Sequence, residues 1–83
     1  LSAKELGLDA DTIRSKLRDG HPIICIMGPG DFTSTGHFIV LTGVKSNGDV
    51  TVNDPNSRKN SDKSWDLEEI MSQMRNLWVY SKA

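Results

Sequence analysis

Residues 36–55 read GHFIVLTGVKSNGDVTVNDP and predict the centre of the fold. Two runs rich in β-branched residues, 38–44 and 50–52, flank the pair Asn47-Gly48. This pair is the strongest short-range signal for a two-residue hairpin turn with positive φ at both central residues. Pro55 ends the second run, because proline has no N–H to donate to a ladder. We therefore expect an antiparallel pair of strands.

The segment before this hairpin predicts a further strand and a helix. Residues 23–27, IICIM, are apolar at every position, which is typical of a central strand covered on both faces. Further upstream, Asp9 is a good N-cap and Gly20 is a good stop signal for a short amphipathic helix over about 10–19. We therefore expect a helix that leads into the middle of the sheet.

The segment after the hairpin predicts a loop, a helix and a last strand. Residues 55–64 are polar and favour a loop, after which Asp66 and Glu69 form a capping box. The buried stripe of this helix is predicted by four residues at i, i+3, i+4 and i+7: Leu67, Ile70, Met71 and Met74. Residues 77–80 favour a strand. The expected fold class is α+β, with an antiparallel sheet of about four strands and two helices.

Composition narrows the class of protein. At 83 residues the chain is one domain or part of one, and we expect residues 1–83 to be a fragment, since the sequence opens without Met. Ten basic and eleven acidic residues are scattered along it and give a net charge of −1, so nucleic acid is not an expected partner. The longest apolar run, 22–27, is far shorter than the roughly 20 residues that cross a bilayer, so no membrane insertion is expected.

His37 and Asp54 stand at the two ends of the predicted hairpin and are candidates for catalysis. A two-residue turn would pair Leu41 with Asp54, which places both candidates on one face but four residues, about 13 Å, apart. Strand twist, or a bulge for which Gly43 is a candidate, would have to shorten this gap. If they meet, Asp54 would hold the Nδ1–H of His37 and leave the other nitrogen to take a proton from a nucleophile. The alternative is a surface histidine beside an Asp-Pro turn.

The sequence offers no clear nucleophile for such a pair. Cys25, the only cysteine, lies within the apolar run, where a thiol is a buried hydrophobe with a raised pKa. Ser34 and Thr35 lie near His37 in the sequence, but no Gly-x-Ser-x-Gly elbow surrounds them. The glycines of 28–30 lack the Lys of a phosphate loop and favour a turn or a flap over a cleft. No metal-ligand spacing is present, so no metal and no cofactor are expected.

Three of these stretches resemble one known family. GHFIVLTGV at 36–44 and VTVNDP at 50–55 resemble the C-terminal part of bacteriocin-processing-type cysteine peptidases of the papain-like clan, and GHPII at 20–24 resembles the segment that precedes it. The resemblance is closest to a subgroup of bacterial cell-envelope domains. It implies the C-terminal part of a papain-like fold, a peptide or protein substrate, and a location that is extracellular or in the cell envelope.

The resemblance also implies roles for single residues. His37 corresponds to the general base of a Cys-His-Asp triad and Asp54 to the acid that orients it. Cys25 does not match the nucleophile, which the family carries on a helix further upstream. The chain alone would then be inactive, and the N-terminal segment of its own domain, or an oligomer, would cover an apolar face. Two functions stay open: a cysteine peptidase, or a non-catalytic module of the same fold that binds a cell-wall or protein ligand.

Overall fold

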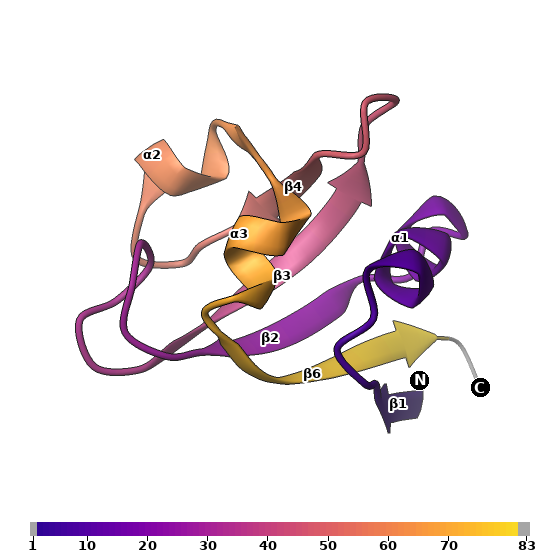
Figure 1. The fold of residues 1–83 in the computed structure, drawn as a ribbon, viewed down its shortest axis with the longest axis horizontal. Helices are drawn as coiled ribbons and strands as arrows, with labels where there is room; N and C mark the ends of the chain where they lie inside the picture. The colour runs from indigo at the N-terminus through magenta and orange to yellow at the C-terminus, as the bar shows by residue number, and fades with distance from the viewer. Residues whose placement is uncertain (1, 82–83) are drawn as a thin grey trace.

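The computed structural model describes residues 2–81 and has one six-stranded antiparallel sheet in the order β1-β6-β2-β3-β4-β5 (Figure 1). Along the chain the elements are β1 (Ser2–Glu5), α1 (Ala10–Arg18), β2 (Ile23–Met27), β3 (His37–Val44), β4 (Val50–Asn53), α2 (Arg58–Ser61), β5 (Ser64–Trp65), α3 (Leu67–Met71) and β6 (Met74–Ser81). The α+β class and the antiparallel sheet are confirmed. The expected number of elements was wrong, since the structure has six strands and three helices.

The unexpected elements have weak local signals. β1 has the polar sequence SAKE and lies at the edge of the sheet, where it pairs only with β6. β5 has two residues, and α2 is a single turn within the polar stretch that was expected to be a loop. Each of them is formed through pairing or packing with distant parts of the chain, because so short a segment has little stability alone.

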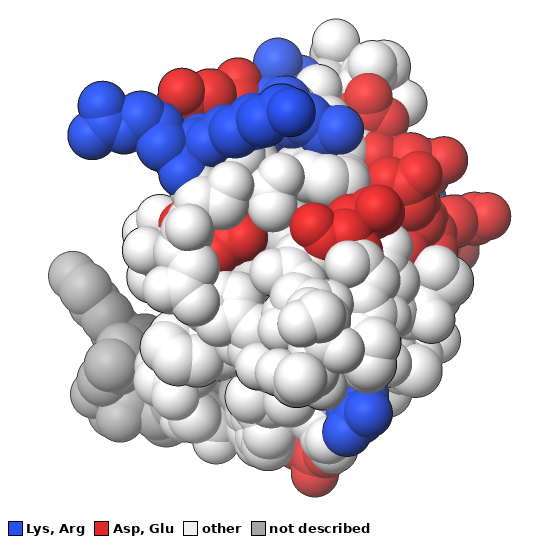
Figure 2. All heavy atoms as spheres, turned by 90° about the vertical axis from the view of Figure 1, so that its left-hand side faces the viewer, with Lys and Arg blue, Asp and Glu red and all other residues white. Residues whose placement is uncertain are grey.

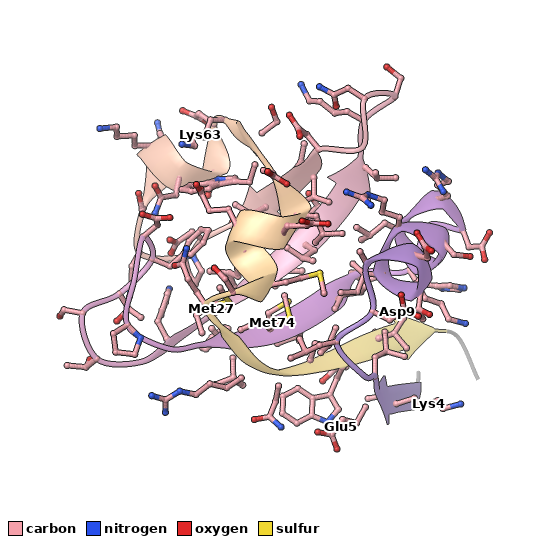
Figure 3. All side chains as sticks on the ribbon, viewed as in Figure 1. Lys4, Glu5, Asp9, Met27, Lys63 and Met74 are labelled. Atoms are coloured by element: carbon pink, nitrogen blue, oxygen red, sulfur yellow. The ribbon has the colours of Figure 1, made fainter. Side chains whose placement is uncertain are left out.

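The last helix is shorter than its apolar spacing predicts. Asp66 caps α3 as expected, with its side chain accepting from the Glu68 N–H, but the helix ends at Met71. Met74 is buried as predicted, yet it is the first residue of β6 and pairs with Met27 of β2. The two methionines lie side by side beneath α3 (Figure 3). The last residue of the predicted helical stripe, Met74, is therefore buried by a strand and not by the helix.

The helices cover one face of the sheet. Ile13 and Leu17 of α1 pack with apolar residues of α3 and with alternate residues of the strands in a single core (Figure 1). In β2 the residues on this face are Ile23, Cys25 and Met27, and all three are fully buried. Strand β2 is central as predicted, but Ile24 and Ile26 on its other side are only partly buried by residues 2–81.

The opposite side of the sheet is apolar and partly exposed, and we call it the open face. Its apolar members are Ile24, Ile26, Phe38, Val40, Trp78 and Tyr80, which alternate with core residues along β2, β3 and β6. Phe38 is the most exposed of them, at 50%. A contiguous apolar face that is partly exposed is typical of an interaction surface.

The β3–β4 hairpin differs from the predicted two-residue turn. The N–H of Gly48 donates to the carbonyl of Lys45 at 2.9 Å, and the N–H of Lys45 donates to the carbonyl of Asp49 at 2.7 Å. Gly48 has φ of 91°, and among residues 2–81 no residue other than glycine has positive φ. This is a three-residue loop, in which only the glycine needs the left-handed region. Asn47 therefore does not take the conformation that the sequence suggested.

Candidate active site

A bulge in the hairpin brings His37 close to Asp54. The three-residue loop moves the register by one residue, and a bulge between Leu41 and Gly43, for which Gly43 was a candidate, moves it by one more, so that Leu41 pairs with Val52 rather than with Asp54. Asp54 then comes opposite Ile39, two residues rather than four from His37, which is about 7 Å along the strand. The side chains span the rest, and His37 Nε2 lies 2.9 Å from Asp54 Oδ1.

The carboxylate of Asp54 is fully buried and saturated with hydrogen bonds. Besides the His37 ring, Oδ1 accepts from the backbone N–H of Asn56 at 2.9 Å, and Oδ2 accepts from the side-chain amide of Asn60 at 3.2 Å. Burial raises the pKa of Asp54, but these bonds and the neighbouring imidazole outweigh it and hold the pKa below its ordinary value. Asp54 is therefore a carboxylate at neutral pH.

Helix α2 is the support of this carboxylate. Its N-cap is Ser57, and its last residue, Ser61, accepts the backbone N–H of Asp54 at 2.8 Å through the hydroxyl. The Ser61 hydroxyl donates in turn to a carbonyl, either that of Ser57 at 3.0 Å or that of Asp54 at 3.3 Å. Asn60, which holds Oδ2, belongs to the same turn. The polar stretch after Pro55 thus folds back onto the residue that precedes it.

The His37 ring is turned the other way from the sequence prediction. Asp54 holds Nε2 rather than Nδ1. A carboxylate without a proton can only accept, so in the neutral imidazole Nε2 carries the proton and Nδ1 has the lone pair. Nδ1 lies 3.3 Å from the side-chain amide nitrogen of Asn56. The pair can accept a further proton at Nδ1, with Asp54 stabilising the imidazolium.

The other candidate residues do not join this pair. Burial raises the pKa of the Cys25 thiol to about 12, as its position in an apolar run suggested. A thiol with this pKa is protonated at neutral pH and does not act as a nucleophile. Within residues 2–81, Ser34 and Thr35 are exposed and neither side chain forms a hydrogen bond with His37. The described residues also contain no group of three or more His, Cys, Asp or Glu that could hold a metal ion.

The loop over 28–36, which leads into His37, is fastened by Gln73. The N–H of Asp31 donates to Oε1 of Gln73 at 2.7 Å, and Nε2 of Gln73 donates back to the Asp31 carboxylate at 2.8 Å. The N–H of Gly28 donates to the Gln73 carbonyl at 2.7 Å. A Cβ at Gly30 would lie 2.2 Å from Gln73 Oε1, so a larger residue there would displace the Gln73 side chain from this position. No local pattern pointed to Gln73, which lies 42 residues from its partner Asp31.

An aromatic pair closes the same region. Phe32 packs on Trp65 with ring centroids 4.6 Å apart, and both residues are buried. The Trp65 indole N–H donates to the carbonyl of Asn60 at 3.0 Å, and the Lys63 ammonium lies 3.8 Å from the Trp65 ring centroid (Figure 3). The loop before His37 and the helix after Asp54 are therefore joined through Trp65.

The surface at this end of the molecule carries charges of both signs. Figure 2 shows Lys and Arg side chains in a band along the top and Asp and Glu side chains gathered on the right, with mostly uncharged atoms between them. Helix α2 contributes two exposed basic residues, Arg58 and Lys59. No helix within residues 2–81 has both the length and the apolar character needed to cross a membrane.

An antiparallel α+β sheet with a buried His–Asp pair at the start of one strand is consistent with the class of cysteine peptidase-like domains with a papain-like fold. A family model described as "Peptidase_C39 like family" matches residues 2–83, and the chain belongs to this family. Comparison with curated proteins and with solved structures gave no match.

Proposed function

We propose that this chain is the acid–base part of a cysteine peptidase that hydrolyses peptide or isopeptide bonds. In this proposal His37 is the general base and Asp54 is the residue that orients it. The observation that carries the proposal is the 2.9 Å contact between His37 Nε2 and an ionised, fully buried carboxylate. An imidazole held in this way has one nitrogen available for proton transfer, which is what activation of a thiol requires.

The proposed reaction has two stages. A thiol gives its proton to Nδ1 of His37, and the thiolate attacks the carbonyl carbon of the substrate. The imidazolium then gives this proton to the leaving amine, and an acyl-enzyme remains. In the second stage His37 takes a proton from water, the resulting hydroxide attacks the acyl carbon, and the thiol is restored with the proton returned by His37. Asp54 stays ionised throughout and stabilises each imidazolium.

The thiol comes, in this proposal, from a segment upstream of residues 1–83. Two observations support a second segment: Cys25 is buried with its pKa raised to about 12, and the open face leaves apolar side chains in water. Phe38 is the most exposed member of that face, and its ring centroid is 5.6 Å from that of His37. Because His37 pairs with Met27 on the helix side of the sheet, whereas Phe38 belongs to the open face, a segment packed over Phe38 would bring its thiol to the imidazole around the start of β3. The chain alone would be inactive, and an oligomer is the alternative way to cover the face.

The proposed substrates are peptides or proteins of the bacterial cell envelope, and the proposed location is extracellular or within that envelope. Both proposals rest on the resemblance of the stretches at 20–24, 36–44 and 50–55 to a subgroup of such domains. The balanced net charge of −1 argues against nucleic acid as a partner.

The proposal is tested with a version of the protein that extends upstream of Leu1. It is treated with a thiol alkylator across a range of pH, and the labelled cysteine is located by mass spectrometry. We expect rapid labelling, at neutral pH or below, of a cysteine outside residues 1–83, and slower labelling in His37→Ala. His21→Ala is the matched control, since His21 has no contact with Asp54. If no such cysteine reacts faster than a free thiol, the peptidase proposal fails and the binding module becomes the better account.

A further inference from the structure

The side chain of Asn56 occupies the one nitrogen of His37 that the proposed reaction uses. Its amide nitrogen lies 3.3 Å from Nδ1, while Asp54 holds Nε2. The imidazole of His37 is therefore engaged at both nitrogens, and only 10% of the side chain is exposed. Nδ1 is the nitrogen with the lone pair, because Asp54 can only accept from Nε2. The contact with Asn56 thus joins a donor to an acceptor.

We propose that the Asn56 side chain is a replaceable cap on Nδ1 of His37, which covers this nitrogen at rest and leaves it when a nucleophile or another hydrogen-bonding group arrives. Asn56 acts through His37 and is a positioning residue. The identity of the arriving group rests on the proposed function, whereas the cap itself depends only on the contact between Asn56 and His37.

The backbone and side chain of Asn56 have separate tasks, which makes the cap movable. The backbone N–H is fixed by its 2.9 Å hydrogen bond to Asp54 Oδ1. The Asn56 side chain is exposed, and within residues 2–81 its only hydrogen bond is the one to Nδ1 of His37. Rotation of the side chain therefore breaks one bond and leaves the support of Asp54 in place. Water or a thiol can then take the vacated position.

The amide also suits both charge states of the ring. An amide group has a donor nitrogen and an acceptor oxygen at the same distance from the chain, and rotation by half a turn exchanges them. With neutral His37 the nitrogen of Asn56 donates to the lone pair of Nδ1. With the imidazolium the oxygen of Asn56 accepts from Nδ1–H. An ionised carboxylate at this position could only accept and would suit the imidazolium alone.

The test uses diethyl pyrocarbonate, which acylates an imidazole nitrogen that has a free lone pair. The full chain and its Asn56→Ala variant are labelled at neutral pH, and the products at His37 and His21 are measured separately by peptide mass spectrometry. A neutral hydrogen bond of ordinary strength corresponds to about a fivefold change in rate. We expect His37 to be labelled about fivefold faster in Asn56→Ala, with His21 unchanged in both proteins.

Two controls keep the result specific. Asn53→Ala removes an exposed asparagine from the end of β4 and should leave the labelling of both histidines as in the wild type. In the wild-type protein, nitrogen-15 NMR should find the ring proton of neutral His37 on Nε2. Equal labelling of His37 with and without the Asn56 side chain, or a neutral ring with its proton on Nδ1, would overturn the cap. These results do not depend on any upstream cysteine, so they are distinct from failure of the peptidase proposal.

Discussion

Replacement of Asp54 by Asn should destabilise the chain by about 3 kcal/mol at neutral pH. Asp54 accepts three hydrogen bonds at a fully buried position, from His37, Asn56 and Asn60. An amide oxygen can still accept from His37 and Asn56, but both bonds become neutral, at a loss of about 1 kcal/mol each. The amide nitrogen would face the Asn60 amide nitrogen, donor against donor, which costs about 1 kcal/mol more.

The same substitution should flatten the acid dependence of stability. The pKa of Asp54 in the folded state lies below its ordinary value of 3.8. The stabilisation from this depressed pKa is therefore complete above about pH 4 and is lost as the pH falls through the folded-state value. The difference in unfolding free energy between wild type and Asp54→Asn should accordingly shrink from about pH 6 to about pH 2.

Urea denaturation followed by tryptophan fluorescence measures both quantities. Asp62→Asn is the matched control, because Asp62 is exposed at the end of α2 and should change stability by less than about 0.5 kcal/mol. A difference between wild type and Asp54→Asn that is the same at pH 6 and pH 2 would refute the reasoning, because it would mean that the charge of Asp54 adds nothing to the hydrogen bonds.

Two further predictions concern the loop before His37 and the buried thiol. Gln73→Ala should speed amide hydrogen exchange at Asp31, because the N–H of Asp31 donates to the Gln73 side chain. Gly28 should stay protected, because its N–H donates to the Gln73 backbone. Equal acceleration at both residues would show that the whole loop has opened. Cys25 in the folded chain should resist iodoacetamide at pH 8 and react fully in denaturant, since burial raises its pKa to about 12; rapid labelling of the folded chain would contradict this.

Local signals were sufficient for the centre of the fold. The β-branched runs around Asn47-Gly48, the apolar stretch at 23–27 and the cap at Asp9 predicted β2, β3, β4 and α1 close to their observed bounds. A bulge with Gly43 as its candidate was one of two ways in which the gap between His37 and Asp54 could shorten, because glycine within a strand often marks a bulge, and the structure has it. These features depend on residues that are neighbours in the sequence.

The geometry of the site depends on contacts that the sequence does not display. The pair Asn47-Gly48 is compatible with two loop lengths, and the longer one changes the register by a residue. Together with the bulge, this brings Asp54 within reach of the His37 ring. The supports in α2 and at Gln73 were missed for the same reason, since their stability comes from tertiary partners and not from local propensity.

The place of β1 limits how any upstream segment could reach His37. Ser2 pairs with Ser81, at the end of β6 that lies away from the Met74–Met27 pair and from His37 beside it. From Ser2 to His37 the route crosses three strand spacings, about 14 Å, and seven residues of strand, about 23 Å, so its diagonal is about 27 Å. A helix of about 18 residues has this length. A segment that precedes Ser2 and brings a thiol to His37 must therefore span at least about 27 Å, from one corner of the sheet to the opposite one.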